Sequence, residues 1–125
     1  MRIIIETIPH ASQRYDTVGD WIWEDENNLR IRVSSMGRRR YAALVAVHEL
    51  VEALLCRERG ITTEMVDTFD KAFEAGRPEG NEDEPGDHPK CPYREEHFFA
   101  TTVERLLAAE LGVDWTEYER RVNGL

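Results

Sequence analysis

The chain is short of cysteine and of long apolar runs. Its 125 residues include two cysteines, Cys56 and Cys91, too few for a disulfide framework, so we expect a reducing, cytoplasmic setting. No apolar run approaches the roughly 18–20 residues that cross a bilayer. The apolar stretch Ile3–Ile5 is too brief for a signal peptide. We therefore expect neither a membrane anchor nor an export signal.

Positive charge is also in the minority. Lys and Arg total 16 against 25 Asp and Glu, which gives a net charge of −9. This balance disfavours nucleic acid and anionic membranes as partners, because binding to either depends on excess positive charge. Hydrophobic residues make up 41% of the chain, enough for a folded core. We expect one domain, residues 1–125, without repeats or an internal linker.

The first 36 residues have the composition of β-strands. Ile3–Ile5 opens a β-branched run that ends at Pro9, and Val18–Trp23 is rich in strand formers. Leu29–Val33 alternates apolar and charged residues, which is typical of a strand with one solvated face. Asp25–Asn28 supplies turn residues between these two strands. Residues 1–36 therefore predict a small antiparallel sheet of about three strands, covered on one face.

The rest of the chain predicts helices and one long loop. Glycines at the expected ends, a capping pattern at Asp114 and Glu117, and long stretches without Gly or Pro predict helices over residues 38–59, 62–76, 92–111 and 114–122. Residues 77–91 are rich in Gly, Pro and acidic residues and predict an acidic loop. The expected fold class is α+β: the sheet, three main helices and a short C-terminal helix.

The segment Tyr41–Cys56 is apolar around most of its circumference, which is typical of a buried helix. Apart from its two weakly acidic end residues, its ionisable side chains are His48, Glu49 and Glu52. At about 100° per residue, these three fall within one arc of roughly 100°. Burial of an unpaired carboxylate costs several kcal/mol, so these groups need partners or a cation.

The spacing of these residues suits a metal site. A His and a Glu four positions apart, His48 and Glu52, lie about 6 Å apart on one helix face and can share an ion. Glu49 is displaced around the helix, where it can take a proton from a water. The alternative is that His48 and Glu52 pair with each other or with core arginines. Because three ionisable groups lie in one arc of this helix, we favour the metal site over simple pairing.

The segment His48-Glu49-Leu50-Val51-Glu52 resembles the active-site helix of the zincin metallopeptidases, whose pattern is His-Glu-x-x-His. Glu52 stands where the second His is expected. A small sheet ahead of such a helix is similar to the zincin core, in which an edge strand borders the substrate cleft. The layout also resembles small phage-type or bacterial zincin-like proteins. The resemblance implies Zn²⁺, His48 as a ligand, Glu49 as the general base, and a peptide or protein substrate. Glu52 becomes a ligand only by substitution of residue type.

A catalytic zinc usually has three protein ligands and a water. In the predicted helix 92–111, His97 and Glu104 fall on one stripe with Thr101 and Ala108. We predict His97 as the third ligand, and Glu104 as a fourth ligand or as the group that orients an imidazole. The alternative is an ordinary polar helix edge. The neighbouring apolar face is expected to pack on the helix 38–59 and consists of Phe99, Val103, Leu106 and Leu107.

The acidic loop and its end carry weaker signals. His88 and Cys91 have the spacing of a metal-binding pair, which predicts alternative ligands or a closing lid, but no second such pair accompanies them. The simpler interpretation is that Pro89 and Pro92 shape the entry to the next helix. The acidic residues of the loop favour, at most, a cationic partner.

Two other functions compete with the zinc hydrolase. Glu49, Glu52, Glu64 and Asp67 resemble the paired acidic motifs of the all-α nucleotide pyrophosphohydrolases, which hold Mg²⁺. The β-rich start does not suit that fold, and Glu64 at the opening of a helix is favourable without any metal. The other alternative is a non-enzymatic, acidic interaction protein with a structural ion or none. The sequence does not predict an oligomeric state.

Overall fold

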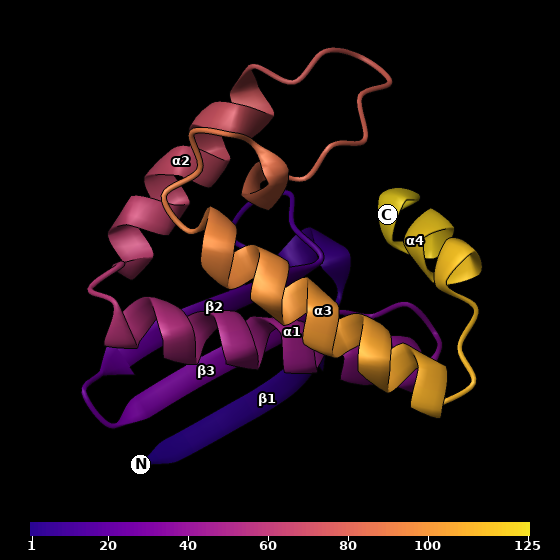
Figure 1. Ribbon diagram of the computed structural model, residues 1–125, viewed down its shortest axis with the longest axis horizontal. Coiled ribbons are helices and arrows are strands. Elements are labelled where there is room, and N and C mark those ends of the chain that lie inside the picture. The colour runs from indigo at the N-terminus through magenta and orange to yellow at the C-terminus, as the bar shows by residue number, and fades with distance from the viewer.

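The computed structural model describes residues 1–125 as a three-stranded sheet with helices packed on one face (Figure 1). The fold class is α+β, as expected. The elements are, in order, β1 (Arg2–Ile8), the 3-10 helix η1 (His10–Ser12), β2 (Gly19–Asp25), β3 (Asn28–Ser34), α1 (Arg39–Glu58), α2 (Thr63–Ala75), the 3-10 helix η2 (Pro85–Asp87), α3 (Arg94–Glu110) and α4 (Trp115–Asn123).

The sheet is mixed, so the prediction of an antiparallel sheet was wrong in part. The strand order is β1-β3-β2; β3 pairs antiparallel with β2 through the predicted hairpin, but parallel with β1. Residues 9–18 connect β1 to β2 around the end of β3, where the side chains of His10 and Gln13 lie 2.8 and 3.1 Å from Ser34 Oγ. This connection leaves β3 between the other strands. The alternation of apolar and polar residues along a strand does not depend on which strands pair with it. The sequence pattern therefore could not predict this strand order.

One face of the sheet is covered, as the alternation in β3 predicted. Leu29, Ile31 and Val33 are fully buried beneath α1. The intervening Arg30 and Arg32 project from the opposite face, where both lie 3.3 Å from Glu6 Oε1. Charged residues on that face pair with one another and need no covering layer.

Helix α1 lies between the sheet and α3 (Figure 1). The predicted packing face of α3 was wrong in part, because Phe99 and Leu106 are 54% and 66% exposed. Ala100 and Ala108 are buried instead. These small side chains let two helices approach closely, and the polar groups on the same stripe then find partners on α1. Val103 and Leu107 are half-buried.

The helix ends follow the sequence signals closely. Asp114 Oδ1 accepts a hydrogen bond from the Glu117 amide at 2.9 Å, as the capping pattern predicted. Gly60 and Gly112, with φ of +73° and +68°, follow α1 and α3 and end them in the left-handed conformation that favours glycine. The loop 77–91 is irregular except for η2. None of the helices combines the length and apolarity that a membrane span requires.

Candidate metal centre

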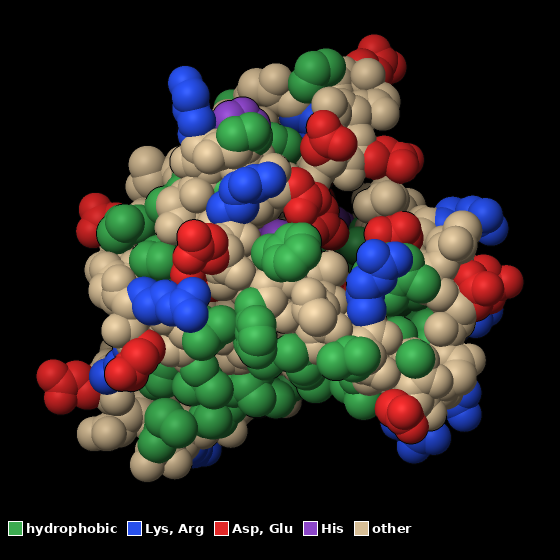
Figure 2. All heavy atoms as spheres, viewed as in Figure 1, with side chains coloured by type: hydrophobic (Ala, Val, Ile, Leu, Met, Phe, Trp, Pro, Cys, Tyr) green, Lys and Arg blue, Asp and Glu red, His purple; other side chains and the backbone are tan.

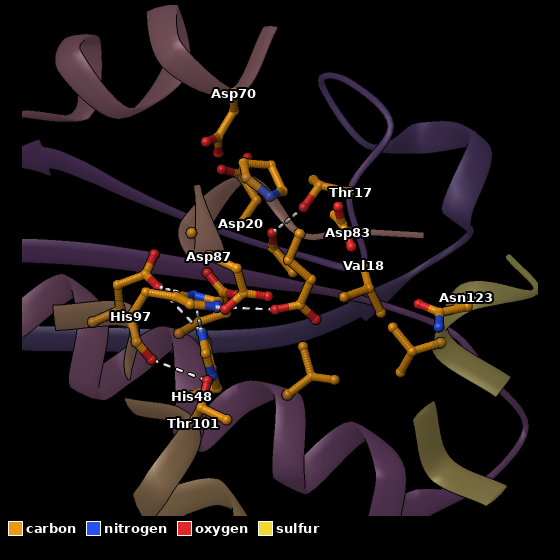
Figure 3. A pocket seen from close by; sticks show the side chains of 18 of the residues that line it. Thr17, Val18, Asp20, His48, Asp70, Asp83, Asp87, His97, Thr101 and Asn123 are labelled. Carbon is orange, nitrogen blue, oxygen red and sulfur yellow. Dashed lines mark hydrogen bonds and ion pairs between the residues drawn. The ribbon is translucent and has the colours of Figure 1, made fainter. Parts of the chain in front are cut away.

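Four ionisable side chains meet where α1 packs on α3. His48, Glu49 and Glu52 of α1 are each at most 8% exposed, and His97 of α3 is 7% exposed. Figure 3 shows His48 and His97 directed toward each other from the two helices. Their ring centroids lie 4.7 Å apart. The structure thus brings together the three residues predicted as metal ligands and places the predicted base beside them.

Three donor atoms form a nearly equilateral triangle. His48 Nε2 and His97 Nδ1 lie 3.2 Å apart, and each lies 3.1 Å from Glu52 Oε2. Three hydrogen bonds along these edges need three hydrogens, but each ring nitrogen carries at most one and a carboxylate oxygen none. At most two of the three edges can therefore be hydrogen bonds, and the close approach of the two ring nitrogens is left without one.

The triangle and its donor types fit a transition-metal ion. Ligand atoms at about 2.0–2.1 Å from a tetrahedral zinc are about 3.3 Å from one another, close to the observed edges. Two imidazoles and one carboxylate suit zinc, whereas Mg²⁺ prefers oxygen ligands. The three residues are grouped closely enough to hold one ion.

The far sides of two of these residues are fixed by neighbours. Glu104 Oε1 lies 2.8 Å from His48 Nδ1, and its other oxygen accepts a hydrogen bond from the Tyr118 hydroxyl at 2.5 Å. Glu52 Oε1 accepts a hydrogen bond from the Trp21 indole at 3.0 Å. Glu104 Oε1 thus faces the nitrogen of His48 that points away from the triangle, which is the position that the predicted orienting role requires.

The acidic loop lies against the far side of His97. Glu84 Oε2 and Asp87 Oδ1 lie 2.9 and 3.7 Å from His97 Nε2, without hydrogen-bond geometry. The backbone of Gly86 packs on the ring so closely that a Cβ there would lie 2.2 Å from His97 Cγ. Glu84, Asp87 and His97 Nε2 form a second close group of donors. Loop 77–91 therefore forms one wall of the site.

Glu49 differs from its neighbours because its carboxylate makes no hydrogen bond, although the residue is 8% exposed and lines a cavity. Burial and the nearby Glu52 carboxylate raise the pKa of Glu49, against the opposing effect of His48. Strand β2 passes close to it: a Cβ on Gly19 would lie 2.7 Å from Glu49 Cγ. Glu49 is thus held in place and free to accept a hydrogen bond.

Each imidazole has a raised pKa. Burial opposes the charge on His97, but the carboxylates of Glu52 and Glu84 beside its two ring nitrogens outweigh burial and raise its pKa to about 10. The pKa of His48 is also raised, because its Glu104 and Glu52 partners outweigh the same opposing burial. Burial acts to raise the pKa of Glu52, yet the two imidazoles lower it to about 2. Without a metal, the centre is a network of ion pairs.

A cavity of about 610 Å³ opens beside these groups. Its walls come from β2, α1, α3, α4 and the acidic loop, and residues 17–21 of the β2 side line it. Asp70, held by the hydroxyls of Tyr15 and Tyr93, lies at another part of this cavity (Figure 3). The arrangement leaves room for a ligand next to Glu49.

Other predicted candidates lie elsewhere. Neither Glu64 nor Asp67 lines the cavity; Glu64 is exposed, and Asp67 binds the Arg14 guanidinium at 2.7 Å. His88 is exposed and accepts a hydrogen bond from the Lys90 amide. Cys91 is buried as a free thiol and also lies outside the cavity lining. The four-carboxylate arrangement is therefore not assembled, and the His88–Cys91 pair does not join the triangle.

Sequence reasoning missed the residues that support the centre. Trp21 lies in a predicted strand and Tyr118 in a predicted short helix far along the chain, and neither has a sequence pattern that links it to the centre. Gly86 and Glu84 belong to the predicted acidic loop, whose composition favoured, at most, a cationic partner. The one available signal was the Pro-Gly-Asp sequence at 85–87, which favours a tight turn but does not identify its neighbour.

Comparison with known proteins does not add to this description. No protein-family model, no curated protein and no solved structure matches the chain.

Proposed function

We propose that this protein is a zincin-like, metal-dependent hydrolase that cleaves peptide bonds. The triangle of His48 Nε2, His97 Nδ1 and Glu52 Oε2 carries the proposal, since hydrogen bonds account for at most two of its three edges and all three match those of a tetrahedral zinc site. Zn²⁺ held by these residues would supply Lewis acidity toward a carbonyl oxygen.

The chain's own residues take distinct parts in such a reaction. Glu49, which has no partner, accepts a proton from a water in the cavity and passes it to the departing amine. A cation in the triangle favours the ionised form of Glu49 and so opposes the effect of burial on its pKa. Glu104 and Trp21 hold His48 and Glu52 in place through hydrogen bonds.

The sheet offers a place for a peptide substrate. β2 is an edge strand, because it pairs only with β3, and Gly19, Asp20 and Trp21 line the cavity beside Glu49. An extended peptide can add to such an edge through main-chain hydrogen bonds. This placement brings the peptide backbone alongside the proposed base.

The test combines metal content with turnover. Protein purified without chelator is analysed by mass spectrometry for bound metal and incubated with a diverse peptide mixture. We expect about one zinc per chain and new cleavage products. Glu49→Gln is expected to retain the metal and lose cleavage, whereas His48→Ala should lose both.

Three results would count against this proposal. A wild-type protein without bound metal that is indifferent to His48→Ala in stability and ion uptake contradicts the metal centre. Cleavage that survives Glu49→Gln contradicts the assigned base. Stoichiometric zinc with no cleavage by the wild type favours the alternative of a structural ion in an interaction protein.

A further inference from the structure

We propose that the cavity selects substrates with a cationic side chain, so that a lysine or arginine of the peptide lies among the acidic residues at its rim. This inference rests on the proposed function and names its substrate class. Figure 2 shows Asp and Glu side chains gathered around the hollow between the acidic loop and α4. Six exposed carboxylates line the cavity: Asp16, Glu82, Asp83, Glu84, Asp87 and Glu119.

The positive charges in the cavity lining do not offset this set. Arg77 binds the carboxylate of Glu74 at 2.7 Å and the carbonyl of Asn81 at 2.6 Å. The guanidinium of Arg105 stacks 4.7 Å from the centre of the Trp115 ring. No lysine lines the cavity. An incoming cation therefore meets six carboxylates, none of which forms an ion pair with a Lys or Arg of the protein.

Three of these carboxylates lack any ion pair. The carboxylates of Glu82 and Asp83 accept hydrogen bonds only from asparagine side chains, and that of Glu119 accepts none. Asp16 lies 2.9 Å from His10, and the remaining two face His97. Carboxylates on separate elements, converging on one concavity with low-dielectric walls, concentrate the negative potential there.

A buried carboxylate points to a ligand in the same cavity. Glu49 is 8% exposed, makes no hydrogen bond and lines the cavity. A peptide bound along β2 would place its backbone near Glu49 and extend a long side chain toward the rim. Lysine and arginine have the length and the charge for that position.

The experiment uses three five-residue peptides, acetylated and amidated, with four alanines around a central lysine, norleucine or glutamate. Binding to metal-loaded Glu49→Gln protein and to metal-free wild type is followed by amide NMR titration. We expect the lysine peptide to bind about tenfold more tightly than the norleucine peptide, and the glutamate peptide most weakly. Added salt should reduce the preference.

Two triple variants, each of which removes three negative charges, test whether the rim carboxylates cause the preference for the lysine peptide. Glu82→Gln/Asp83→Asn/Glu119→Gln removes three rim charges and should abolish most of the preference. Glu58→Gln/Glu95→Gln/Glu110→Gln removes three exposed charges that do not line the cavity and should preserve it. Equal binding of the lysine and norleucine peptides, or an equal loss in both variants, overturns the inference.

Metal content is measured on the same samples to separate the two proposals. Metal bound without lysine preference overturns only this inference. Absence of metal overturns the proposed function, while the lysine preference remains measurable on the metal-free protein. A second metal ion that binds at Glu84 and Asp87, without any lysine preference, also overturns the inference, because the acidic rim then serves a metal.

Discussion

The imidazole of His48 and the carboxylate of Glu104 lie 2.8 Å apart, although 56 positions separate them in the chain. The contact joins Nδ1 to Oε1, and a proton on Nδ1 leaves Nε2 with its lone pair directed at Glu52 and His97. In the neutral ring, this contact between α1 and α3 thus favours the tautomer that a metal ligand requires.

Loss of this carboxylate should weaken metal binding. Glu104→Gln keeps the size of the side chain but removes the charge that favours a proton on His48 Nδ1. We expect the zinc affinity to fall about 10–100-fold, measured by competition with a chelating dye. Glu110→Gln, an exposed change on the same helix, should leave the affinity unchanged. An unaltered affinity in Glu104→Gln would show that Glu104 does not orient the ligand.

The contact of the loop with His97 gives a steric test. A Cβ at Gly86 would lie 2.2 Å from His97 Cγ, so Gly86→Ala must displace either the loop or the ring. We expect about 1–3 kcal/mol lower stability by chemical denaturation and weaker zinc binding. Gly76→Ala is the control, because its nearest neighbour would lie at an ordinary 3.6 Å. Equal effects of both changes would mean that the loop does not constrain His97.

Metal binding should release protons at neutral pH. Burial opposes the charge on His97, but Glu52 and Glu84 raise its pKa to about 10, so the metal-free ring is protonated at pH 7.5. A metal needs the neutral ring, so about one or two protons should leave on binding, and the apparent affinity should rise with pH toward 10.

Calorimetry checks this proton release. The observed binding enthalpy at pH 7.5 should vary linearly with the ionisation enthalpy of the buffer. His88→Ala alters an exposed histidine outside the cavity and should give the same slope. A binding enthalpy independent of the buffer would contradict the protonated state of the metal-free centre.

Asp70 should make stability decrease as pH rises. Its burial, opposed by hydrogen bonds from Tyr93 and Tyr15, raises the pKa of Asp70 from 3.8 to about 7. The unfolded state therefore loses this proton first, between about pH 4 and 7, and the folded state loses relative stability over that window, on the order of 4 kcal/mol at most.

The measurement compares wild type and Asp70→Asn in metal-free form. The free energy of unfolding of the wild type, relative to that of Asp70→Asn, should fall from pH 4 to pH 7 and then level off. Parallel pH profiles for the two proteins would contradict the raised pKa. Asp67→Asn serves as a control, since Asp67 lies in the same helix and pairs with Arg14.

The sequence alone was informative about local structure. The Asp114 cap, the glycines after α1 and α3, and the alternation in Leu29–Val33 predicted elements that the structure contains. These signals are strong because neighbouring residues in the chain produce them. The arc of His48, Glu49 and Glu52 is equally local, since helix geometry fixes their relative directions.

The tertiary structure decided which elements meet. The parallel pairing of β1 with β3 depends on the connection 9–18, and the buried face of α3 depends on Ala100 and Ala108, which let α1 approach. The contacts of Trp21 with Glu52 and of Gly86 with His97 arise between segments far apart in the chain. Residue spacing fixes directions within one helix or strand, whereas distances between elements depend on how the whole core packs.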